Sequence, residues 1–328
     1  MRSSLARLIL SLSVGLFFTF VVSSLKAHDV EKVTYAGSPG ISVPVLVAID
    51  RGYFAEEGLD VEYQLLQTGK LAMEAVMSGR ADFGSVVITN VAYAGFQTED
   101  LRLLASYGAM YDDAVVFRLP STIHEVKDLK DKKIGLVMST SSQDFLIHLL
   151  DKNGLSWADI KTVSLQPATM LAALKGNQVD AVVTWEPWRS GIRRAMNGAI
   201  GEIVNNANIY HRHSFCASTS GYLAKHPDVP PKLLRALLKA EGFMDTHQNE
   251  TFDIVAKVTG QKREDVQTYV APVHIYMGHD ILPLIKSYAA LITQHQEDFF
   301  NKTMPNYSWN IDSTFLKAVA PQRVEKRM

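Results

Sequence analysis

The sequence has little cysteine and no excess of basic residues. Cys216 is the one cysteine among 328 residues, so no disulfide can form within the chain, and we expect it to be a small buried side chain. The 33 lysines and arginines face 34 acidic residues, which gives a net charge of −1. Basic tracts and alternating basic and aromatic residues are missing, and we therefore expect no nucleic-acid partner.

Motifs of common catalytic sites are missing as well. The sequence contains no GxSxG elbow, no HExxH pair, no GxxxxGK[ST] loop and no GxGxxG turn. His211 and His213 could bind a metal from one face of an extended segment, but no third cysteine, histidine or acidic ligand follows nearby. We therefore expect no enzyme, no metal site and no cofactor.

One long apolar run occurs, at the start of the chain. It covers Leu8 to Val22, follows Arg2 and Arg7, and ends in small residues at Ala27. This pattern predicts a cleavable signal peptide over 1–27, because the run is shorter than the roughly 20 residues of a membrane helix. The alternative is an uncleaved anchor. Cleavage would change the net charge from −1 to −4 and leave a periplasmic protein, which we expect to be a soluble monomer.

The chain is 47% apolar and long enough for about two domains. The stretch around which it is organised begins with an expected strand, Ile134 to Met138, and a hydroxyl-rich turn, Ser139, Thr140, Ser141 and Ser142. A helix follows, with a capping box of Ser141 and Asp144 and a stop at Asn153-Gly154. The free N–H groups and the positive dipole end of such a helix can hold an anion, although serine and threonine also serve as plain caps.

The same pattern occurs twice. Met73 to Asp82 and Met170 to Asp180 each predict a helix of small residues, a glycine, and an aspartate that opens an apolar strand. Val33 to Ala36 enters a turn and a helix from about Ser42, as Ile134 to Met138 does. We therefore predict an α/β fold of two β-α-β lobes with parallel strands, whose ligand cleft lies at the carboxyl ends of the strands.

Two hinge strands are expected to join the lobes. The first crossing is predicted at Asp112 to Val115, and a polar helix over 121–133 should follow it. The second crossing is predicted at Cys216 to Ser220, inside a return strand from Ser214 to Tyr222. Lobe 1 would then comprise 28–113 and 217–328, and lobe 2 would comprise 114–216.

Several segments together resemble one family. RGYFAEEGLDVEY, VKDLKDKKIGLVMSTSS, VDAVVTWEPW and YLAKHPDVPPKLLRALL look like the nitrate/sulfonate/taurine group of periplasmic solute-binding proteins. The resemblance covers nearly all of the chain after 1–27. It implies a type II periplasmic-binding fold that closes on a small solute and delivers it to the permease subunits of an ABC importer.

The resemblance also implies where the solute lies. Ligand contacts should fall on turns at the cleft: Ser38, Pro39, Thr68, Gly69, Ser85, Thr89, Ser139, Thr140, Ser141, Ser142, Trp185 and Glu186. Ligand identity does not transfer, because the family varies most in these turns.

The residues favour a small organic anion of the sulfonate or taurine type. The hydroxyl turn at 139–142 would hold its anionic group. Glu186 beside Trp185 would suit an amine on the same ligand, although a tryptophan at the end of a strand is often packing alone. A neutral heteroaromatic solute, such as a thiamine-pyrimidine precursor, is the alternative ligand, and an enzyme or sensor domain is the alternative function. The related pyrimidine synthases carry a cysteine-rich motif that this chain lacks.

Overall fold

The computed structural model describes residues 30–278, 280–295, 299–300 and 302–324. The predicted signal peptide, 1–27, lies outside these residues. Across the described ranges, no helix combines the length and the apolar character that crossing a membrane requires.

The first of two five-stranded sheets has the order β2-β1-β3-β10-β4. Strands β1, β2 and β3 run parallel to one another, whereas β10 runs antiparallel to both of its neighbours. The bounds are β1 Glu31–Gly37, β2 Leu59–Leu65, β3 Phe83–Val87, β4 Leu101–Met110 and β10 Arg212–Thr219.

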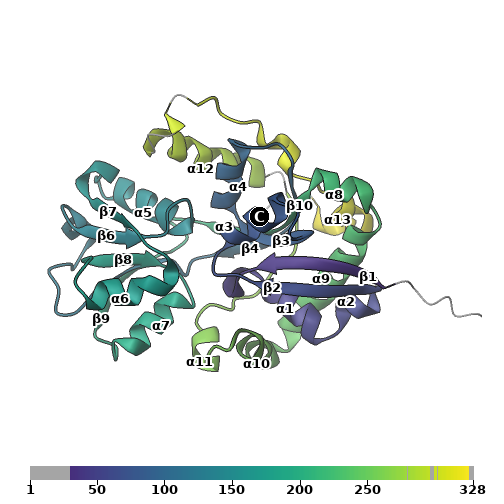
Figure 1. Cartoon of the computed structure of the whole chain (residues 1–328), viewed down its shortest axis with the longest axis horizontal. Coiled ribbons are helices and arrows are strands. Elements are labelled where there is room, and N and C mark those ends of the chain that lie inside the picture. The colour runs from purple at the N-terminus through teal and green to yellow at the C-terminus, as the bar shows by residue number, and fades with distance from the viewer. Residues whose placement is uncertain (1–29, 279, 296–298, 301, 325–328) are drawn as a thin grey trace, which may run out of the picture.

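Helices from both ends of the described chain pack around this sheet (Figure 1). Those between its strands are α1 Val43–Asp50, α2 Tyr53–Glu56, α3 Gly69–Met77 and α4 Ile88–Gly95. Those that follow β10 are α8 Ser220–Lys225, α9 Val229–Thr246, α10 Gln248–Thr259, α11 Arg263–Val266, α12 Ile281–His295 and α13 Thr314–Val319.

The second sheet repeats the plan of the first with the order β7-β6-β8-β5-β9, and it forms a separate half of the molecule in Figure 1. Its strands are β5 Ala114–Arg118, β6 Lys133–Leu136, β7 Lys161–Ser164, β8 Ala181–Thr184 and β9 Ile200–Val204. Its helices are α5 Ser141–Lys152, α6 Met170–Lys175 and α7 Trp188–Ala195. The α/β architecture predicted from the alternation of strands and helices is confirmed.

The sequence repeat has a matching hydrogen-bond pattern in each half. Asp82 Oδ2 accepts from the backbone N–H of Thr34 at 2.8 Å, and its own N–H donates to the Thr34 carbonyl at 2.9 Å. Asp180 makes the same pair of bonds with Lys133, both at 2.8 Å. Each aspartate therefore ties the start of its strand to the first parallel strand of its sheet.

The antiparallel strand of each sheet comes directly after a connection from the other half. The first connection joins Met110 to Ala114, close to the predicted crossing. The second joins Val204 to Arg212, earlier than the predicted crossing at Cys216 to Ser220. Residues 212–216 were assigned to lobe 2 from the sequence, but they pair with the first sheet. Strand β10 begins as early as Arg212 because its pairing with β4 continues through two shifts of register.

Two local predictions were wrong. The polar segment 121–133 contains a 3-10 turn at Val126–Leu129 instead of a helix, because Asp128 accepts from the N–H groups of His124 and Glu125 and closes a short turn. The capping box of Ser141 and Asp144 does not form either. Thr140 occupies the cap position, so Ser141 is already the first helical residue, and no side chain caps the helix.

Candidate functional site

A small cavity lies where turns of the two halves meet. Its volume is about 20 Å³, which is room for roughly one water molecule. The first half contributes the turns that follow β1, β2 and β3, and the second half contributes the start of α5 and the end of β8. The lining residues are Ser38, Ile41, Thr68, Gly69, Lys70, Val87, Asn90, Thr140, Ser141, Trp185 and Arg212.

Half of the residues predicted to bind the solute line this cavity, and they come from both halves of the chain. They are Ser38, Thr68, Gly69, Thr140, Ser141 and Trp185. Sequence positions more than one hundred residues apart therefore meet at one place, as expected for parallel strands whose carboxyl ends face each other.

Three other predicted hydroxyl residues are occupied by bonds within the protein. The Ser85 hydroxyl pairs with Tyr35 at 3.1 Å, inside the first half. The Thr89 hydroxyl pairs with Tyr210 at 2.8 Å. The Ser142 hydroxyl donates to the Val137 carbonyl at 3.1 Å. None of the three lines the cavity described above.

Some residues of the hydroxyl turn at 139–142 stabilise the turn itself, and others line the cavity. Thr140 also donates to the Val137 carbonyl, at 2.7 Å, so its oxygen is held in place as an acceptor. Ser139 has a left-handed backbone with φ of 60°, and its N–H donates to Gln143 Oε1 at 2.7 Å. Ser141 lines the cavity, and its hydroxyl lies near the buried carboxyl of Asp113. Within this turn, Ser141 is the hydroxyl best placed for a ligand.

Glu186 acts at the start of a helix. Its Oε2 accepts from the N–H of Ser190 at 3.0 Å in the first turn of α7, and the Arg189 guanidinium lies 3.9 Å from Oε1. Burial raises the pKa of this carboxyl, and the Ser190 bonds and Arg189 oppose the rise. These contacts supply partners for Glu186 inside its own half.

Arg212 is the main feature that sequence reasoning missed. Its side chain is 2% exposed, forms an ion pair with Asp112, and places Nη1 3.5 Å from Asp113 Oδ1. It also lines the cavity, where the sequence had suggested no cationic group. Asp112 in the first connection and Arg212 directly after the second carry opposite charges, but they lie one hundred positions apart and no local pattern links them. Lys70, partly exposed, lines the cavity from the first half.

Two donors at this cavity lack partners. Asn90 Oδ1 accepts from the N–H of Val87 at 3.2 Å, which fixes the amide so that Nδ2 is the free end. Nδ2 of Asn90 and Nε of Arg212 are buried without a hydrogen-bond partner among the described residues. Buried donors are normally paired. Both residues line the cavity, so an acceptor placed there would satisfy them.

A larger groove of about 630 Å³ adjoins the same turns. The predicted residue Pro39 lines it beside Ser38 of the cavity, and Pro187 and Trp188 line it next to Glu186. Leu65, Leu66 and Gln67 precede Thr68 of the cavity along the chain. The turns that close the small cavity thus also form the walls of this groove, which is wide enough for the organic part of a solute.

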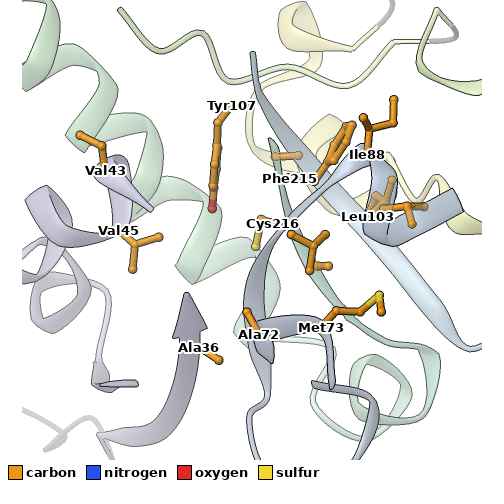
Figure 2. Packing of buried hydrophobic residues seen from close by; sticks show 14 of the residues in the cluster. Ala36, Val43, Val45, Ala72, Met73, Ile88, Leu103, Tyr107, Phe215 and Cys216 are labelled. Atoms are coloured by element: carbon orange, nitrogen blue, oxygen red, sulfur yellow. The ribbon is translucent and has the colours of Figure 1, made fainter. Parts of the chain in front are cut away.

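Cys216 lies in the apolar core of the first half, where Figure 2 shows it among Tyr107, Phe215 and Leu103. Burial raises the pKa of its thiol to about 12, so the thiolate is scarce at neutral pH. His211 and His213 stack at 6.3 Å. Within the described ranges, no group of three or more histidine, cysteine or acidic residues could hold a metal ion.

Comparisons with known proteins identify the relatives of this chain. A family model described as NMT1/THI5 like matches residues 41–251. A Bacillus subtilis (strain 168) protein assigned to aliphatic sulfonate binding is 27% identical over 250 residues, which cover 73% of this chain and 74% of that protein. The periplasmic aliphatic sulphonate binding protein SsuA of Escherichia coli aligns with a TM-score of 0.73 and 20% identity, over 84% of this chain and 95% of SsuA.

An enzyme shares the fold. The desulfurization enzyme DSZB aligns with a TM-score of 0.68 and 15% identity, over 89% of this chain and 99% of that chain. Together these likenesses show that the two five-stranded sheets form the fold of periplasmic binding proteins. At these identities they show the fold alone, so the chemistry has to be argued from the residues of the site.

Proposed function

The chain belongs to the NMT1/THI5-like family, and on that premise we propose that it binds a small organic anion of the sulfonate class and delivers it to an ABC importer. Solute binding of the periplasmic-binding-protein type is common to its relatives. The proposal adds the ligand class, the importer and a place of action in the periplasm.

The observation that carries the proposal is the pair of buried donors without partners at the cavity, Asn90 Nδ2 and Arg212 Nε. Ser38, Thr68 and Ser141 surround them with further possible donors, and Lys70 adds positive charge. Charge-assisted hydrogen bonds contribute about 1.5–3 kcal/mol each. An oxyanion with several acceptor oxygens would use all of these groups, whereas a hydrocarbon would use none.

We also propose that binding involves movement of two lobes about the connections at 111–113 and 205–211. The cavity holds roughly one water molecule in this arrangement, which is too little for a sulfonate group. The halves must therefore stand further apart when the solute enters, as in hinge closure around a ligand. This movement is compatible with the proposed monomer and with its proposed transport role. Binding and release of a solute require no catalytic step.

The test is a thermal-shift and calorimetric screen of ligand-stripped protein against ethanesulfonate, taurine, nitrate, bicarbonate and an aminopyrimidine. A ligand present at 100 times its Kd stabilises the folded state by about 2.7 kcal/mol, which corresponds to a shift of several degrees. We expect a sulfonate to give the largest shift.

Asn90→Asp is the variant that tests the site. It keeps the acceptor for the Val87 N–H and replaces the free donor with a negative charge, so sulfonate affinity should fall at least about tenfold. Asn197→Asp makes the same change at an exposed position and should leave affinity unchanged. If Asn90→Asp binds the sulfonate as tightly as the wild type does, the proposed anion site is wrong. If the aminopyrimidine alone shifts the unfolding temperature, the ligand is a heteroaromatic compound instead of a sulfonate.

A further inference from the structure

One ion pair joins the two halves of the chain at the groove. Arg194, near the end of α7 in the second half, pairs with Asp265 of α11 in the first half. Both residues line the groove of about 630 Å³. The Asp265 side chain is 13% exposed, so most of its contact with water is lost in this arrangement. Separation of the two halves at this groove would break the pair.

The other two arginines of α7 pair within their own half. Arg189 Nε lies 3.1 Å from Glu202 Oε1 of β9, and Arg193 Nη2 lies 2.6 Å from Glu202 Oε2. Arg194 instead pairs with a carboxylate 71 positions away in the sequence. The Glu202 pairs persist whatever the position of the two halves, whereas the Arg194–Asp265 pair requires α7 and α11 to lie together.

Asp265 is held in place by contacts within the first half. Its backbone carbonyl accepts a hydrogen bond from the Thr268 hydroxyl at 2.7 Å. Earlier in α11, Arg263 Nε lies 2.6 Å from Asp253 Oδ1 of α10. Because these contacts do not involve the second half, the carboxylate keeps its position when Arg194 moves away. Less conformational entropy is therefore lost when the pair forms again.

Two contacts between the halves at α5 are uncharged. Tyr93 of α4 donates to Gln143 Oε1 at 3.3 Å, and the ring centroids of His148 and Tyr288 of α12 lie 5.3 Å apart. Burial lowers the pKa of His148, so this ring is neutral at pH 7. In Figure 1, α5 and α12 lie above α7 and α11. Salt screens the ion pair and leaves the uncharged contacts nearly unchanged, so ionic strength distinguishes the two sets of contacts.

We propose that the Arg194–Asp265 ion pair holds the two halves together at the groove and slows release of the solute. The inference rests on the proposed movement of two lobes, and it applies to any solute that the closed arrangement surrounds. A partly exposed ion pair changes an equilibrium by about two- to fivefold. The effect should appear in the dissociation rate, because the pair is present in the closed arrangement and absent while the solute enters.

The test measures release of ethanesulfonate by stopped-flow tryptophan fluorescence, since Trp188 lines the groove. At low salt, Arg194→Gln should raise the dissociation rate about two- to fivefold and leave the association rate nearly unchanged. Salt at about 0.5 M should remove the difference, because the Debye length then falls to about 4 Å. The exchanged pair, Arg194→Asp with Asp265→Arg, should restore slow release. Arg193→Gln, on the same helix and paired within its own half, is the control and should change neither rate.

A second measurement needs no solute. Arg194→Asp places two negative charges together, so small-angle scattering of the ligand-free protein should give a larger radius of gyration than the wild type, and Arg193→Asp should not. An unchanged radius of gyration for Arg194→Asp overturns the inference, as does a dissociation rate that Arg194→Gln and Arg193→Gln change equally. If ethanesulfonate does not bind the wild-type protein, the proposed ligand class fails, and the scattering comparison alone decides on the ion pair.

Discussion

Helix α1 follows the first parallel strand of its sheet, and α5 follows the equivalent strand in the other half, yet their first turns differ in chemistry. Helix α1 begins with Val43, Pro44, Val45 and Leu46, all apolar and buried. Helix α5 begins with Ser141, Ser142, Gln143 and Asp144, all polar and equally buried. The two helices follow equivalent strands, so the difference between their first turns comes from the elements that pack over each helix start.

The covering elements explain the contrast. Helix α1 packs against α9 and α10 of its own half, where apolar contact stabilises the fold. Helix α5 contacts α12, which packs with the first half, and Gln143 accepts a hydrogen bond from Tyr93 of α4 at 3.3 Å. Buried polar groups that meet across the two halves are costly for stability. Their presence in the first turn of α5, and not in that of α1, supports the binding role proposed for this helix start.

The largest effect is expected at Arg212, whose strand belongs to the first sheet and whose partners lie in the connection to the second. Arg212→Met would leave Asp112 and Asp113 without their cation. Breaking a buried ion pair in this way costs about 3–5 kcal/mol, and urea unfolding at pH 7.5 should show that loss. Arg212→Lys keeps the charge and should lose less. A loss below about 1 kcal/mol for the methionine variant would contradict the assigned ion pairs.

The next effect concerns Asp144 and depends on pH. Burial raises the pKa of this carboxyl from 3.8 to about 7, so the folded protein favours the protonated form. The contribution to stability is therefore complete below about pH 4 and is lost as the pH rises through 7. At about 1.4 kcal/mol per pKa unit, the loss reaches at most about 4 kcal/mol.

Asp144→Asn should abolish this loss. The variant should be more stable than the wild type at pH 8, and the difference should shrink towards pH 5, as measured by urea midpoints at both values. Asp151→Asn, exposed on the same helix, should show no such dependence. An Asn variant that gains nothing at pH 8 would mean that a partner already compensates the charge of Asp144.

Much of the fold was predictable because its signals are local. A helix of small residues, a glycine and an aspartate marked the repeat in each half, and Asp82 and Asp180 make the same bonds in the structure. The predictions that failed concern either contacts between residues distant in sequence or a helix cap that is shifted by one residue. Arg212 pairs with Asp112, which lies one hundred positions away in the sequence, and no local pattern indicates that pair. Thr140 displaces Ser141 from the cap position by a single residue, which removed the predicted capping box.

The smallest effect compares the two equivalent aspartates directly. Asp82→Ala removes the acceptor of the Thr34 N–H in a partly buried position, and a hydrogen bond to a charged group contributes about 1.5–3 kcal/mol. Asp180→Ala removes the same bond to Lys133 at an exposed position, where water replaces the lost acceptor, so about 1 kcal/mol or less is expected. Asp82→Asn keeps an acceptor oxygen and should recover most of the loss. Unfolding midpoints measure the loss of stability in each variant, and hydrogen exchange at the Thr34 and Lys133 amides measures the loss of each hydrogen bond. Equal losses at the two sites would show that solvent exposure does not distinguish the halves, and a larger loss at Asp180 would reverse the order argued here.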